Sequence, residues 1–106
     1  MLVKINNTVE ADLTAISEYW NGVSDSSGVS VSFHWSNSLN DLKNLLVNQD
    51  GYTIEVFDID NHKIYHKDCN VIVNITKAVF ALADDVNIDD YSEFTIFFDN
   101  VNNNQP

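Results

Sequence analysis

The stretch SLNDLKNLLVNQDGYTIEVFD, residues 38–58, decides the fold class because it places an amphipathic helix directly before a β-strand. Four leucines share one stripe of this helix: Leu39, Leu42, Leu45 and Leu46. Ser38 and Asp41 form an S-x-x-D box, which can bind free N–H groups of the first turn. After Gly51, residues 52–59 are expected to form a strand.

Downstream of this stretch, the sequence predicts a hairpin. Asp60 and Asn61 favour a turn, so residues 63–67 should pair antiparallel with the strand before them. Residues 76–86 are expected to be helical because their apolar residues fall at helical spacing: Val79, Leu82, Ala83 and Val86. The remaining segments are strands at residues 71–75 and 93–101 and a disordered tail at residues 102–106.

Upstream, residues 2–5 are expected to form a strand and residues 9–23 a helix with Thr8 as its N-cap. The apolar residues of this helix recur three or four positions apart: Val9, Leu13, Ile16, Trp20 and Val23. Residues 29–35 alternate between apolar and polar side chains, which predicts a half-buried strand. The elements together predict one α+β domain over residues 1–101, a mainly antiparallel sheet with two or three helices packed on it.

The charge of the chain restricts its partners. The 106 residues contain 16 Asp and Glu against five Lys and no Arg, which gives a net charge of -11. Arg is the preferred residue for bidentate phosphate recognition, so binding of nucleic acid or anionic membrane is not expected. No stretch reaches the ~18 apolar residues of a membrane span. With one cysteine and no visible export signal, a cytoplasmic location is expected.

A metal site is suggested at first by His62, His66 and Cys69, which form an H-x3-H-x2-C run near three aspartates. On the predicted hairpin, however, residues four apart are separated by ~13 Å, whereas zinc ligands must lie ~2 Å from one metal. A calcium loop is also excluded, because glycine and glutamate are missing from its sixth and twelfth positions. We therefore expect no metal and no cofactor.

No catalytic motif is recognisable either. Cys69 and His66 are only neighbours in sequence, and no G-x-S-x-G elbow presents a serine nucleophile. The carboxylate pairs at residues 84–85 and 89–90 lie at an element border that is expected to be solvated, so acid–base catalysis is not indicated. The chain is expected not to be an enzyme.

Binding to a basic protein is what the charge pattern favours. Five carboxylates lie within ten positions, with no lysine among them: Asp84, Asp85, Asp89, Asp90 and Glu93. Such a cluster attracts a cationic partner and accelerates association. Tyr91, inside the cluster, is of the residue type enriched at interface hot spots. Asp58 and Asp60 of the hairpin turn are expected to join this partner-binding surface.

In size, acidity and the run at residues 38–58, the chain resembles the small acidic immunity proteins that bacteria make against their own nuclease toxins, including those of contact-dependent growth inhibition. The resemblance implies a cytoplasmic inhibitor that occludes the active site of one cognate toxin. Two alternatives fit similar observations. One is a phage-encoded nucleic-acid mimic that blocks a host nuclease, restriction enzyme or CRISPR effector, and the other is an acidic subunit of a larger complex.

Overall fold

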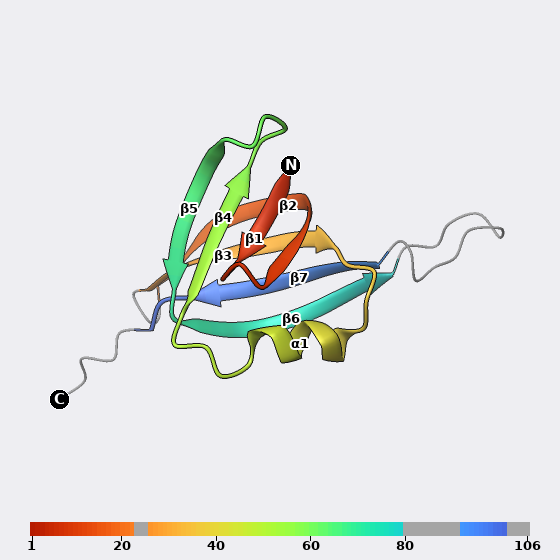
Figure 1. The fold of residues 1–106 in the computed structure, drawn as a ribbon. Coiled ribbons are helices and arrows are strands. Elements are labelled where there is room, and N and C mark those ends of the chain that lie inside the picture. Colours follow the sequence, from red (N-terminus) through yellow and green to blue (C-terminus); the bar gives the residue numbers. More distant parts are fainter. Residues whose placement is uncertain (23–25, 80–91, 102–106) are drawn as a thin grey trace.

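Seven strands form one sheet in the computed structural model, which describes residues 1–22, 26–79 and 92–101 (Figure 1). The strands lie in the order β5-β4-β1-β2-β3-β7-β6, and every neighbouring pair is antiparallel. The elements are β1 (Leu2–Ile5), β2 (Val9–Asn21), β3 (Ser26–His34), α1 (Leu39–Leu46), β4 (Tyr52–Phe57), β5 (Lys63–Cys69), β6 (Val71–Val79) and β7 (Ser92–Asp99). The predicted α+β class with a mainly antiparallel sheet is confirmed.

The two edge strands, β5 and β6, are consecutive in the chain and are joined by Asn70 alone. The sheet therefore curls until its edges meet at this point, at the left of Figure 1. The Asn70 N–H donates to the carbonyl oxygen of Asp99 at 3.1 Å. The Asn70 side chain also makes two hydrogen bonds of 2.8 Å with the backbone of Val101. These bonds fix the junction to the end of β7 and give the curled sheet an inner and an outer face.

The inner face carries the hydrophobic core. Three cross-strand pairs of β3 and β7 are fully buried there: Val29 with Phe98, Val31 with Ile96, and Phe33 with Phe94. Leu42 and Leu46 of α1 belong to the same cluster, together with Ile5 of β1 and Ile54 of β4. Because side chains alternate along a strand, the residues between these positions lie on the outer face.

The helix predicted after Ser38 is confirmed as α1, and it packs on the inner face. Ser38 is the N-cap, and its Oγ accepts a hydrogen bond from the Asp41 N–H at 3.1 Å. The indole Nε1 of Trp35 donates to the Ser38 carbonyl oxygen at 3.2 Å, and the Tyr52 hydroxyl donates to the Leu46 carbonyl oxygen at 3.1 Å. Both ends of the helix are thus fixed, one to Trp35 directly after β3 and the other to Tyr52 of β4.

The helix predicted for residues 9–23 is wrong over residues 9–21, which form β2, while residue 23 lies outside the described residues. A β-bulge at Thr14 shifts the register between Leu13 and Ala15. The extra residue moves the next inner-face positions by one, so that the apolar inner-face residues are Val9, Ala11, Leu13, Ile16 and Trp20. Strand alternation interrupted by one bulge therefore reproduces the three- and four-residue spacing of a helix.

The helix predicted for residues 76–86 is wrong over residues 76–79, which continue β6. This part of β6 pairs with β7 up to the contact of Val79 with Ser92. Residues 80–86 and the predicted tail at 102–106 lie outside the described residues. Within the described ranges α1 is the one helix, so the expected two or three helices are not found. None of the described helical structure is long and apolar enough to cross a membrane.

Candidate partner-binding surface

Only part of the predicted acidic surface lies in the described residues. Five of its eight members fall in the segment 80–91, outside the described ranges: Asp84, Asp85, Asp89, Asp90 and Tyr91. Glu93 is the second residue of β7, while Asp58 and Asp60 lie between β4 and β5. The register of the sheet relates these three residues to one another.

A row of residues crosses the outer face of the sheet at the end where β7 begins. Glu93 of β7 pairs with His34 of β3, and His34 pairs with Asp12 of β2. Asp12 also pairs with Leu2 of β1, whose other neighbour is Phe57 of β4. Neighbouring strands lie about 4.8 Å apart, so the backbones of Asp12 and Glu93 are separated by about 10 Å with His34 between them.

Asp58 directly follows Phe57 and extends this row into the β4–β5 turn. Asp12 and Asp58 line one shallow hollow of about 350 Å³. Glu10, two positions before Asp12 on the same face of β2, lines a neighbouring hollow of about 530 Å³ with Asp12 and His34. We call the five carboxylates of this region the acidic end: Glu10, Asp12, Asp58, Asp60 and Glu93. The structure thus brings Glu93 and the two turn aspartates to the same end of the sheet.

The side chain of Asp58 holds the β4–β5 turn. Its Oδ1 accepts hydrogen bonds from the N–H groups of Asp60 at 2.9 Å and His62 at 2.8 Å. The Asp58 carbonyl oxygen accepts the N–H of Asn61 at 3.0 Å, and Asn61 adopts a φ of 64°. Asn tolerates this left-handed conformation better than most residues do, as the predicted turn requires. The turn holds the Asp60 and His62 side chains out in solvent.

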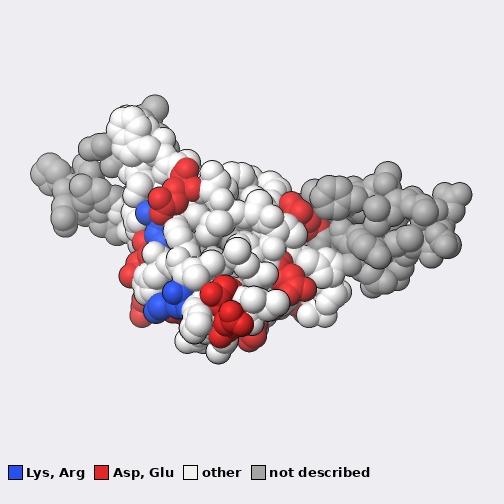
Figure 2. Space-filling view, turned by 90° about the horizontal axis from the view of Figure 1, so that it is seen from above, with Lys and Arg blue, Asp and Glu red and all other residues white. Residues whose placement is uncertain are grey.

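Lysine neutralises little of the acidic end. Lys63 of β5 lies opposite Phe57, at the end of the row, but its ammonium group pairs with Glu55 at 3.1 Å, and Glu55 is not part of the acidic end. Lys4 lies opposite Glu10 in the register, but its ammonium group is 4.9 Å from the ring centre of Phe57. Among the described residues, the acidic end has one ion pair. It joins Asp58 to His62 at 3.6 Å and forms only when His62 is protonated. In Figure 2, the lysines (blue) lie on the left, whereas Asp and Glu residues (red) lie on both the left and the right.

The residues whose potential metal-ligand atoms lie close together are not the three of the H-x3-H-x2-C run. In the described part of the chain, one set of potential ligand atoms lies within 4.8 Å of one another, and it comes from Asp58, Asp60 and His62. One Asp58 oxygen already accepts two backbone N–H groups. These three residues are the ones that could contact a cation, while His66 and Cys69 lie elsewhere.

His66 and Cys69 both belong to β5, but their side chains lie on opposite faces of the sheet. On the outer face, His66 Nε2 lies 3.1 Å from Asp68 Oδ1. Cys69 points into the core and is 4% exposed. Burial raises the pKa of the Cys69 thiol to about 11, although the Lys67 ammonium opposes this effect. The thiol is therefore protonated at neutral pH and lacks the thiolate character that nucleophilic catalysis requires.

The Cys69 thiol should react slowly with an aromatic disulfide reagent. A pKa near 11 instead of the ordinary thiol value of 9.0 lowers the thiolate fraction at pH 8 by roughly 100-fold, and burial blocks access as well. A matched reference is the variant Cys69→Ser/Ser36→Cys, because Ser36 is exposed. We expect Cys69 to react at least about 100 times more slowly than this surface thiol. Comparable rates in the two folded proteins would contradict the burial of Cys69.

Sequence reasoning missed three residues of this surface: Glu10, Asp12 and His34. Reading residues 9–23 as a helix separated Glu10 and Asp12 from the strands that they join. The alternation of Val9, Ala11 and Leu13 with polar residues was the signal for a half-buried strand. The position of His34 between two carboxylates depends on the order of the strands, which no local pattern encodes.

No protein-family model, curated protein or solved structure matches this chain.

Proposed function

We propose that this protein is a non-enzymatic inhibitor that acts in the cytoplasm, most specifically an immunity protein that neutralises a basic nuclease toxin. In this proposal the acidic end covers the site where the toxin binds its nucleic acid. The observation that carries the proposal is the acidic end itself, where five carboxylates from β2, β7 and the β4–β5 turn lie near one another with little compensation by lysine. Carboxylates held on a rigid sheet present the negative charge that a phosphate-binding site attracts.

The segment between β6 and β7 contains further residues that are predicted to belong to the same surface. It is joined to the sheet at Val79 and Ser92, and Ser92 directly precedes Glu93. The five residues predicted within it for partner binding are Asp84, Asp85, Asp89, Asp90 and Tyr91. They remain predicted members of the surface, and the described residues that flank them, Val79 and Ser92, lie at the end of the sheet where the acidic end lies.

The proposal is tested with the protein encoded directly upstream of this chain's gene, the place of a toxin gene relative to its immunity gene. The upstream product should degrade RNA or DNA, and an equimolar amount of this chain should abolish that activity. Expression of the toxin should arrest growth, and co-expression of this chain should restore it. An upstream nuclease that remains fully active at a tenfold excess of this chain would disprove the proposal.

A further inference from the structure

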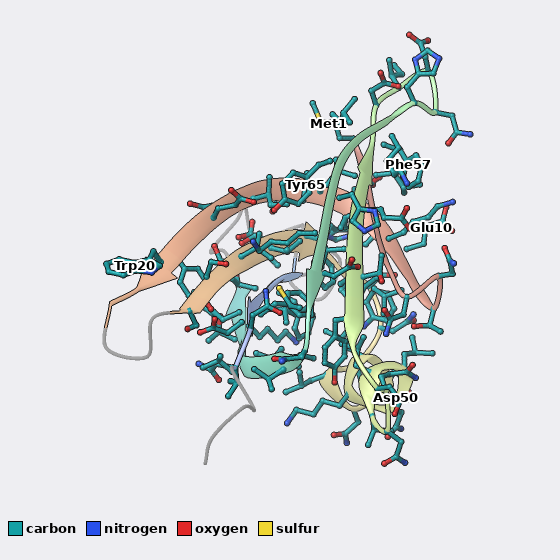
Figure 3. The ribbon with its side chains drawn as sticks, turned by 90° about the vertical axis from the view of Figure 1, so that its left-hand side faces the viewer. Met1, Glu10, Trp20, Asp50, Phe57 and Tyr65 are labelled. Carbon is teal, nitrogen blue, oxygen red and sulfur yellow. The ribbon has the colours of Figure 1, made fainter. Side chains whose placement is uncertain are left out.

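The outer face carries an apolar hollow at the end opposite to the acidic end. The hollow measures about 500 Å³, within the range of small-ligand sites, and is lined by Tyr19, Ser30, Val73, Asn74, Phe97 and Asp99. On β7, Phe97 and Asp99 of the hollow lie four and six residues from Glu93, so the backbones of these lining residues are about 13 and about 20 Å from that of Glu93. In Figure 3, Trp20, the neighbour of Tyr19, projects on the side away from Glu10 and Phe57.

A buried carboxylate lies at this hollow. Asp99 is only 5% exposed, and its Oδ1 accepts the Asn100 N–H at 2.7 Å. Within the described residues, no ion pair involves Asp99 and no hydrogen bond is made to its Oδ2. Burying a carboxylate without a cation is unfavourable, so this side chain favours the arrival of a positive group.

The aromatic lining of the hollow is rigid. The Tyr19 ring lies across Gly28, where an added Cβ atom would overlap it. The Tyr19 hydroxyl donates to the Phe98 carbonyl oxygen at 2.6 Å, which leaves its own oxygen free to accept. Phe97 adds a second ring from β7. Rings and a carboxylate together suit a guanidinium group, which stacks on aromatic rings and binds carboxylates with paired N–H groups.

We propose that this hollow accepts an arginine side chain of the basic partner, with Asp99 as its counter-ion. The proposal rests on the proposed function and adds an anchor point to it. The surface between the hollow and the acidic end is built from small polar side chains, with Ser32 and Thr95 hydrogen-bonded at 2.7 Å. The one helix of the described residues packs on the inner face, so no described helix lies over this outer surface, where a partner could contact both regions.

The test uses N-acetyl-L-arginine amide as the probe, titrated into the ¹⁵N-labelled full chain at low salt. N-acetyl-L-citrulline amide is the neutral isostere, and N-acetyl-L-lysine amide supplies a cation without the planar group. Amide shifts should concentrate at Gly28, Ser30, Phe97 and Asn100. The arginine derivative should bind about tenfold more tightly than citrulline and more tightly than lysine.

Three variants complete the experiment. Asp99→Asn should remove the preference for arginine over citrulline, and Val73→Trp should fill the hollow and block the probe. Val73 is 62% exposed, so this second variant keeps the test valid if Asp99→Asn does not fold. Asp12→Asn, which removes the same charge at the acidic end, should bind the probe as the wild type does.

Equal binding of arginine and citrulline, lysine binding as tightly as arginine, or shifts centred elsewhere would each overturn the arginine site. Persistence of the arginine preference in Asp99→Asn would overturn it as well. The outcome is separable from the proposed function. Nuclease inhibition without probe binding rejects the arginine site alone, whereas probe binding without nuclease inhibition rejects the function alone.

Discussion

Association with the cognate nuclease should slow about tenfold at low salt when three exposed carboxylates of the acidic end are neutralised. The variant is Glu10→Gln/Asp12→Asn/Asp60→Asn, and all three side chains are exposed, so the fold should be retained. Exposed charges are screened beyond about 8 Å at physiological ionic strength, so the difference should shrink as salt is raised. Stopped-flow association rates measured from about 50 to about 500 mM salt would show this convergence.

A matched variant separates the position of the charges from their number. Asp41→Asn/Asp50→Asn/Asp68→Asn removes equal charge at exposed sites in α1, after α1 and on β5. Figure 3 shows Asp50 at the opposite end of the molecule from Met1. This variant should slow association by less than about threefold. Equal slowing by both variants would show that net charge alone acts and that the acidic end is not the contact surface.

Local patterns predicted the parts of the fold that depend on local interactions. The leucine stripe and Ser38 cap predicted α1, and both are present. The turn at Asp60 and Asn61 predicted the β4–β5 hairpin, where Asn61 takes the left-handed conformation. Each of these features is decided by residues within a few positions of one another, so the sequence alone is sufficient to identify them.

Strand β2 shows where local patterns fail. Its inner-face residues are two apart except at Thr14, and this single insertion converts a strand pattern into helical spacing. A bulge is identified by a partner strand that lacks the extra residue, here β3. The spacing of the apolar residues in β2 therefore fits both a helix and a bulged strand, and the partner strand decides between them.

The candidate surface depends on strand order, which lies beyond local pattern. Asp12 and Glu93 are far apart in the sequence, yet each pairs with His34 because β3 lies between β2 and β7. The sequence showed that carboxylates are abundant, and it correctly placed Asp58 and Asp60 at a turn. The register of the paired strands determines which carboxylates lie on the same face of the sheet.

Of the three glycines, Gly28 has the least room for a side chain. It lies opposite Tyr19 in the β2–β3 register, and the Tyr19 ring covers it. A Cβ atom at this position would overlap both that ring and the carbonyl oxygen of Phe98. The ring could move only by breaking its 2.6 Å hydrogen bond, and the carbonyl oxygen belongs to the backbone of β7. Neither obstacle can be avoided by a simple change of side-chain rotamer.

The variant Gly28→Ala should therefore lower the free energy of unfolding by about 3 kcal/mol, from overpacking and loss of the Tyr19 hydrogen bond together. Chemical denaturation compares it with Gly51→Ala, where the added Cβ would lie 3.5 Å from its nearest neighbour and should change stability by less than about 1 kcal/mol. Tyr19→Phe should cost about 1 kcal/mol, because it removes the hydrogen bond but keeps the ring. If Gly28→Ala is no more destabilising than Gly51→Ala, then β2, β3 and β7 do not pack as closely as the structure shows. The lining of the outer-face hollow would then lack the rigidity that an arginine site requires.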